Sequence, residues 1–136
     1  MKLADILSQM SDYTTDSILI TRYNDNEEDN NLEIVYVNKS FTALTGYSFE
    51  EVVGKSPKFL KGPKTSRETL GRIRQAMANR KPITVELLNY SKDGGEYWVE
   101  LNLNPIFCPD AQECPYFLAT ERDITERKNA ESQLLK

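Results

Sequence analysis

Apolar and polar positions along the first 37 residues follow two different periods. Apolar residues recur at helical spacing over residues 3–10, which predicts a short amphipathic helix. Residues 17–22 and 32–37 are rich in β-branched and aliphatic residues, which predicts two strands. The acidic stretch between them, residues 24–31, has no apolar side chain to bury and predicts a loop. Together these segments predict a β-hairpin with a long, solvated connection.

Signals for helix starts and stops fill the middle of the chain. Asn38 can cap a short helix that Gly46 ends. Two pairs of residues then have the spacing of a capping box, namely Ser48 with Glu51 and Thr65 with Glu68. The second pair predicts a longer helix that begins near residue 65 or 66, with Leu70, Ile73 and Met77 on its apolar face. That face is expected to lie against a sheet.

The second half of the chain is strand-like. Residues 83–89, 97–103 and 116–125 predict three strands, and Asp93-Gly94-Gly95 predicts a tight turn between the first two. Two strands, several helices and three strands in this order predict an α+β domain with one five-stranded antiparallel sheet and helices on one face. Its expected organisation is a flanking helix at 1–11, the domain at 12–125, and the start of a C-terminal helix at 126–136.

Length and charge narrow the class of protein. A chain of 136 residues with 39% hydrophobic and 28% charged residues suits one globular domain. The formal net charge of −4 argues against nucleic acid as a partner. No apolar run approaches the roughly 18 residues that a membrane span needs, and the first 13 residues are too polar for a signal peptide. The expected location is therefore cytoplasmic, without membrane contact in this segment.

Histidine is absent from the sequence, and this excludes several kinds of catalytic and metal site. A Ser-His-Asp triad, a Cys-His dyad, an HExxH zinc site and a His-ligated haem all require it. Cys108 and Cys114 cannot form a structural zinc site alone; reduced thiols are the default, and a disulfide between them stays open. The remaining reactive groups form no recognised catalytic arrangement, so an enzyme is not expected.

Two features could bind a small molecule. Asn89 follows Ile83, Val85 and Leu87 on the apolar face of a predicted strand, where an amide must find either a protein partner or the edge of a bound ring. The segment 55–64 (KSPKFLKGPK) carries four lysines, and Arg72 and Arg74 follow it. These cations could hold a phosphate or form a solvated basic patch, and the residues alone leave both interpretations open.

Three longer segments resemble one known family. They are VYVNKSFTALTGYSFEEVVGKSPKFLKGPKTS, LLNYSKDGGEYWVELNLNPI and FLATERDITERKNAE. In this order they are similar to the PAS domain family, and specifically to its flavin-binding LOV branch, over nearly all of residues 12–130. The resemblance implies a five-stranded antiparallel sheet with helices over one face, enclosing a pocket. This agrees with the α+β architecture predicted from periodicity.

The resemblance breaks at the reactive residue of LOV photosensors. Their motif resembles G-x-N-C-R-F-L-Q-G-P, in which the cysteine attacks the flavin after blue-light absorption. Here the segment reads GKSPKFLKGP from residue 54 to residue 63, so Pro57 stands at the cysteine position. Proline has no nucleophile, and neither cysteine of this chain matches that position. A thiol-adduct photocycle is therefore not expected.

The flavin contacts implied by the resemblance are only partly present. At the phosphate end, Lys58 replaces one arginine, Arg74 has the spacing of the other, and Lys61 stands where the family has glutamine. At the ring end, the matching positions are Asn89, Val99 in place of a second amide, and Glu121 in place of glutamine. A buried Glu121 would have to be protonated, paired with Lys58 or Lys61, or else be exposed.

The resemblance implies a sensory or signal-relay input domain of a larger protein, such as a histidine kinase or a cyclic-di-GMP enzyme. Two alternatives remain open at this point: a redox or light sensor that holds FAD or FMN noncovalently, and a cofactor-free domain for dimerisation. A homodimer through the first helix and the outer sheet face is expected. The junction Asp123-Ile124-Thr125 resembles the family's connection to an output helix, which Thr125 can cap.

Overall fold

The computed structural model describes residues 16–23, 32–107 and 115–134. The predicted helix at 3–10, the acidic loop, both cysteines and the last two residues lie outside the described residues. Within them, five strands form one sheet in the order β2-β1-β5-β4-β3. Their bounds are β1 Ser17–Tyr23, β2 Leu32–Val37, β3 Ile83–Tyr90, β4 Glu96–Pro105 and β5 Tyr116–Asp123. All neighbouring strands are antiparallel, as the sequence predicts.

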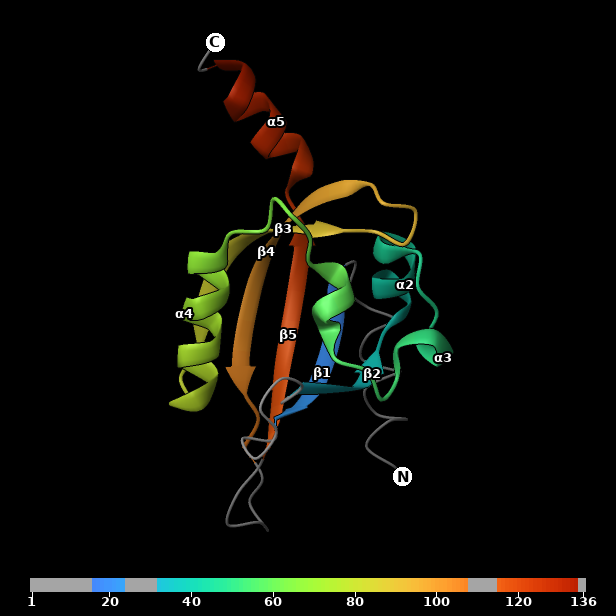
Figure 1. The fold of residues 1–136 in the computed structure, drawn as a ribbon, viewed down its shortest axis with the longest axis vertical. Helices are drawn as coiled ribbons and strands as arrows, with labels where there is room; N and C mark the ends of the chain where they lie inside the picture. The colour runs from blue at the N-terminus through green and yellow to red at the C-terminus, as the bar shows by residue number, and fades with distance from the viewer. Residues whose placement is uncertain (1–15, 24–31, 108–114, 135–136) are drawn as a thin grey trace.

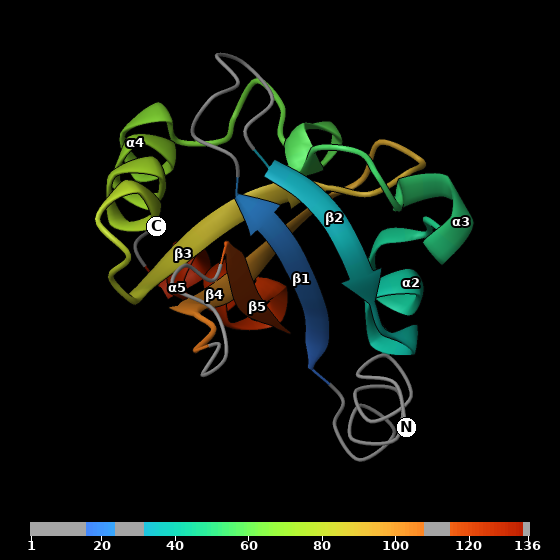
Figure 2. The same ribbon diagram turned by 90° about the horizontal axis from the view of Figure 1, so that it is seen from below.

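The helices between β2 and β3 gather on one side of this sheet (Figures 1 and 2). Their bounds are α2 Lys39–Thr45, α3 Phe49–Val52, the 3-10 helix η1 Pro57–Leu60 and α4 Arg67–Ala78. The sheet and these helices enclose the core, in which Ile34, Phe41 and Phe117 are completely buried. The α+β architecture predicted from the sequence is therefore confirmed.

The predicted caps Asn38, Gly46 and Ser48 are confirmed, whereas the predicted caps Thr65 and Thr125 are wrong. Asn38 and Ser48 cap α2 and α3 through their side chains, the latter in a complete capping box with Glu51. Ser66, not Thr65, caps α4, because the Thr65 hydroxyl instead donates to the carbonyl of Leu88 in β3. A tertiary contact thus takes the side chain that local spacing assigns to the cap.

The C-terminal helix α5, Thr125–Leu134, begins directly beyond β5 and projects away from the sheet (Figure 1). Thr125 is its first residue rather than its cap: the Asp123 carboxylate accepts from the Thr125 backbone N–H at 2.9 Å. The Thr125 hydroxyl instead accepts from the backbone N–H of Trp98 in β4 at 2.8 Å. The predicted strand 116–125 accordingly ends two residues early, and the junction fixes the helix start to the neighbouring strand.

Candidate functional site

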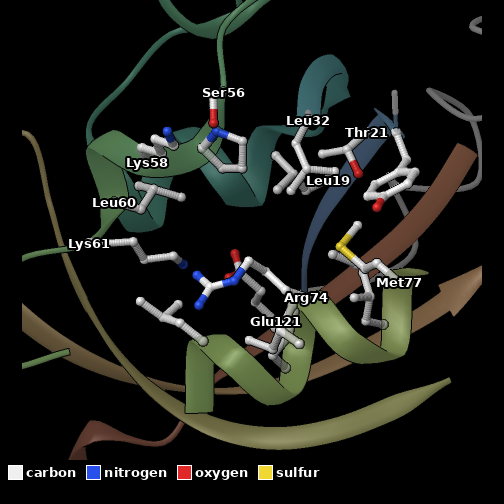
Figure 3. Close-up of a pocket in the computed structure, with 17 residues that line it drawn as sticks. Leu19, Thr21, Leu32, Ser56, Lys58, Leu60, Lys61, Arg74, Met77 and Glu121 are labelled. Atoms are coloured by element: carbon white, nitrogen blue, oxygen red, sulfur yellow. The ribbon is translucent and has the colours of Figure 1, made fainter. Parts of the chain in front are cut away.

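A cavity of about 180 Å³ lies between the inner face of the sheet and the helices η1 and α4 (Figure 3). Strands β1, β4 and β5 form its floor, and α4 and η1 form its opposite wall. It combines apolar walls with a few charged side chains, which is typical of a small-molecule site. Its wall includes five of the residues singled out from the sequence: Pro57, Lys58, Lys61, Arg74 and Glu121.

The two broad walls of the cavity are apolar. Leu101 and Leu103 contribute from β4, because alternate residues of a strand point to the same face. Ile73 and Met77 face them from α4, one helical turn apart, together with Leu60 from η1. The predicted apolar face of the helix is therefore confirmed, and it makes a wall of the cavity. Two opposed apolar walls suit a flat ring.

Two cationic side chains and a proline occupy the side of the cavity formed by η1 and α4. Arg74 projects from α4 and Lys58 from η1, and both residues are largely exposed. Pro57 is the first residue of η1, where its fixed φ suits a helix start and its missing N–H costs no hydrogen bond. The predicted phosphate-binding cations and the residue at the LOV cysteine position thus line the same cavity.

A chain of polar side chains closes the inner end of the cavity. The Lys61 ammonium donates to Oδ1 of Asn89 at 3.0 Å, and Nδ2 of Asn89 donates to Oε2 of Glu121 at 3.4 Å. The Ser17 hydroxyl donates to the other oxygen of Glu121 at 3.5 Å. Asn89 is completely buried and Glu121 is 3% exposed. The amide on the apolar face therefore finds its partners within the protein.

Burial acts in opposite directions on the two charged members of this chain. It raises the pKa of Glu121, because a carboxylate is poorly solvated there, and the positive charge of Lys61 opposes this shift. Burial also lowers the pKa of Lys61, and the charge of Glu121 opposes that shift. Parts of the Lys61 residue reach the surface, but its ammonium lies deep among protein atoms. The sequence left open whether Glu121 is exposed; it is buried, with Lys61 as its neighbouring cation.

The loop that carries Lys61 is fixed to β3. The Thr65 hydroxyl accepts from the Gly62 N–H at 3.1 Å and donates to the Leu88 carbonyl at 2.8 Å. The Tyr90 ring packs against Gly62 so closely that an added Cβ would lie 2.3 Å from its Cε1 atom. Only glycine fits this contact without displacing the ring. The backbone of Lys61 is therefore held while its long side chain retains rotatable bonds.

Two buried hydroxyls near the cavity have no hydrogen-bond partner among the described residues: Thr21 Oγ1, which lines it, and Tyr97 Oη, which does not. Most buried polar groups are paired, so an unpaired hydroxyl on a cavity wall is a contact available to a ligand. Burial, followed by the charge of Glu121, raises the pKa of Tyr97, which stays neutral at ordinary pH. Analysis of the sequence missed Thr21, although it alternates with Leu19 and Tyr23 on the same strand face.

Two predicted site residues do not line the cavity. Asn89 reaches it only through Lys61 and Glu121. Val99 is completely buried in the core, paired in register with Leu87 and Asp123, and offers no polar contact. Sequence analysis also missed Ser17, because the register that places it opposite Glu121 joins strands from opposite ends of the chain.

Comparison with known proteins agrees with this geometry. A family profile described as a PAS domain matches residues 15–126, most of the chain. The chain belongs to the PAS domain family. Within the described part of this PAS domain, no group of three or more Cys, Asp or Glu side chains could hold a metal ion. Nor is any described helix long and apolar enough to cross a membrane.

The similar proteins include blue-light-activated histidine kinases and a solved LOV domain. A blue-light-activated histidine kinase from Rhizobium johnstonii is 41% identical over 101 residues, which cover 74% of this chain and 29% of that protein. Blue-light-activated histidine kinase 1 from Erythrobacter litoralis is 40% identical over 104 residues, again 74% of this chain and 29% of that protein. The solved LOV domain of an Erythrobacter litoralis blue-light activated histidine kinase has a TM-score of 0.71 and 31% identity, covering 81% of this chain and 96% of that domain. The chain thus spans less than a third of the two curated relatives.

Proposed function

We propose that this PAS domain is the sensory input unit of a larger signalling protein and that its cavity binds a flavin nucleotide without a covalent bond. The observation that carries the proposal is the cavity itself, which has two apolar walls, cations beside them and an unpartnered hydroxyl. The similarity to light-activated histidine kinases supports flavin as the ligand class and a kinase-like effector.

The residues of the cavity fit the chemistry of a flavin nucleotide. Lys58 and Arg74 would hold the phosphate by charge-assisted hydrogen bonds. Leucine and isoleucine side chains on the two walls would pack against the faces of the ring, and the Thr21 hydroxyl would gain a partner. When bound, the flavin supplies redox and light-absorbing chemistry, whereas the protein binds it, orients it and keeps water from the ring.

The proposal excludes a cysteine adduct. Pro57 lies on the cavity wall, and among the described residues none that lines the cavity is a cysteine. A bond to sulfur needs a thiolate at the ring, which proline cannot supply. Signalling would therefore depend on noncovalent changes around the ligand.

The route from the cavity to an effector would pass along β5. Glu121 lies at the inner end of the cavity, and two residues later Asp123 accepts from the first N–H of α5. If α5 has two arrangements and the ligand at Glu121 binds more tightly to the protein in one of them, ligand binding would increase the population of that arrangement. The size of the shift would be set by the difference in ligand affinity between the two arrangements. The effector would read the position of this helix.

Absorption spectroscopy tests the proposal. The purified chain, incubated with FMN or FAD and separated from free ligand, is expected to show the visible bands of oxidised flavin. Blue light is expected to leave the protein without the blue-shifted spectrum of a sulfur adduct. Substitution Pro57→Cys is expected to create that light-driven, reversible spectral change, because the introduced thiol would lie against the ring.

Pro57→Ser is the matched control, since it removes the proline ring without adding a thiol. It is expected to bind flavin and to show no adduct spectrum. A folded chain that retains neither FMN nor FAD would contradict flavin binding and favour the cofactor-free dimerisation domain. An adduct spectrum in the wild-type chain would contradict noncovalent binding.

A further inference from the structure

The side chain of Lys61 occupies the polar end of the cavity in which a ligand would lie. Lys61, Arg74 and Glu121 all point into this cavity (Figure 3). The Lys61 ammonium donates to Asn89, the amide that also donates to Glu121. The Lys61 ammonium is thus the hydrogen-bond partner of Asn89 and the neighbouring positive charge of Glu121.

The size of the cavity sets a condition on any ring that enters it. An apolar cavity of about 150 Å³ holds a single benzene ring. The cavity here has about 180 Å³ with the Lys61 side chain inside it. The three fused rings of a flavin need more space than this. The backbone of Lys61 belongs to a fixed loop, but its side chain is flexible. The side chain can therefore rotate out of the cavity while the surrounding walls stay in place.

If the Lys61 ammonium moved out of the cavity, the Glu121 carboxylate would lose its neighbouring positive charge. A buried carboxylate is stable only with a cation or enough hydrogen-bond donors, and otherwise binds a proton. The Asn89 amide and the Ser17 hydroxyl each donate to Glu121, but only at 3.4 and 3.5 Å. Besides Glu121, the charged and titratable residues that line the cavity are Lys58 in η1, Lys61 directly after it, Arg74 on α4 and Tyr23 on β1. The Tyr97 phenol on β4 lies close enough for the charge of Glu121 to raise its pKa.

We propose that Lys61 is a displaceable internal ligand of this cavity, and that flavin entry moves its ammonium outward while Glu121 takes up one proton from solvent. The inference rests on the flavin binding proposed above. Lys58 and Arg74 would then be neutralised by the ligand phosphate, so neither compensates a charge on Glu121. The protonated carboxyl donates a hydrogen bond to an acceptor on the ring edge. No electron is transferred, and the proton is the only species exchanged with solvent.

Proton uptake predicts how binding depends on pH. Uptake of one proton makes the association constant fall about tenfold per pH unit, between the pKa of Glu121 in the free protein and its higher pKa in the complex. FMN affinity is measured by titration from about pH 5 to about pH 9, the range in which buried carboxyls titrate. Calorimetry in two buffers of different ionisation enthalpy counts the protons, with up to one per FMN expected within that window.

Two variants separate the roles of the pair. Glu121→Gln keeps the shape and the donor but cannot titrate, so its FMN affinity is expected to be independent of pH. Lys61→Met keeps an unbranched side chain of similar length but removes the charge. This variant is expected to bind FMN more tightly than the wild type at neutral pH, and its FMN affinity is expected to depend less on pH. Urea unfolding of each variant checks that the fold is intact.

The outcomes distinguish this inference from the function on which it rests. Wild-type binding of FMN with no proton uptake and the same pH profile as Glu121→Gln would overturn the inference and leave flavin binding standing. Equal affinities of the wild type and Lys61→Met at neutral pH would also overturn it. If none of the three folded proteins bound FMN or FAD, the proposed function would fail, and the inference with it.

Discussion

Glu51 shows how one exposed side chain joins two distant parts of this chain. Its backbone N–H donates to the Ser48 hydroxyl in the capping box, and its carboxylate accepts from both the Ser48 N–H and the Lys92 ammonium, the latter at 2.5 Å. Lys92 lies in the turn between β3 and β4, where its N–H also donates to the Thr45 carbonyl. The hydrogen bond from Lys92, followed by that from Ser48, lowers the pKa of Glu51 from 4.5 to about 2.

This contact predicts a specific pH dependence of stability. Because the folded-state pKa of Glu51 is lowered, its ion pair contributes fully above pH 4.5 and is lost as the pH falls through about 2. Lys92→Met is therefore expected to lower the free energy of unfolding slightly at neutral pH. Near pH 2, where Glu51 becomes protonated, the variant and the wild type are expected to be equally stable. Urea unfolding at several pH values measures this, with Lys92→Arg as the control that keeps the charge. A difference that persists unchanged at the lowest pH would contradict the assignment.

At the scale of the elements, the first turn of α5 is the most heavily contacted part of that helix. Arg127 and Lys128 both pair with Glu86 of β3, the latter at 3.1 Å. The Lys128 ammonium also lies 4.5 Å from the centre of the Trp98 ring in β4. Beyond this turn the described residues of α5 are exposed. The first turn of α5 is thus attached to the sheet, and the rest of the described helix is exposed to solvent. Such a helix can change its position with little disturbance of the sheet.

Removing the shared carboxylate tests this attachment. Glu86→Gln is expected to reduce the free energy of unfolding by only about 0.5 kcal/mol, since exposed ion pairs contribute little. Its effect on local opening is expected to be larger: the amides of α5 should exchange hydrogen faster, while those of the sheet do not change. Hydrogen exchange measured by mass spectrometry distinguishes the two regions. Glu33→Gln, on β2 at the opposite edge of the sheet, is the control, and unchanged exchange in α5 of the Glu86→Gln variant would contradict the proposed attachment.

At the scale of the whole molecule, strands from the two ends of the described chain meet at the centre of the sheet. β1 pairs with β5, and this register brings Ser17 opposite Glu121. The inner face of the sheet is covered by helices, whereas Trp98, Glu100 and Asn102 alternate onto the opposite face. That outer face, with the first helix, is where the sequence predicts a homodimer contact.

The predicted homodimer is measured by sedimentation equilibrium. The wild-type chain is expected to sediment as a dimer at micromolar concentration. Asn102→Arg places a charged side chain in the middle of the outer face and is expected to weaken association at least about tenfold, because burying an unpaired charge costs more than about 1.4 kcal/mol. Gln75→Arg on the exposed side of α4 adds the same charge elsewhere and should not alter association. A wild-type chain that remains monomeric would contradict the prediction.

Much of this structure follows from short-range features of the sequence. Alternation of apolar residues fixes which face of β3 and β4 is buried, and the side chains of Asn38 and Ser48 cap their helices by accepting from backbone N–H groups three residues away. Hydrogen bonds over such distances depend on local backbone geometry, so the order of elements and the α+β class could be predicted. The sequence also determines that proline stands at residue 57, whatever the fold.

Tertiary structure alone decided how the cavity is closed. The Lys61 contact with Asn89 spans 28 positions in the sequence, and the Ser17 contact with Glu121 spans 104. No local period encodes such pairs, because they depend on strand register and on the direction of a flexible side chain. The same holds for Thr65, which bonds to β3 instead of capping α4. The sequence supplied the charges, and packing determined that Lys61, rather than Lys58, reaches the buried carboxyl group through Asn89.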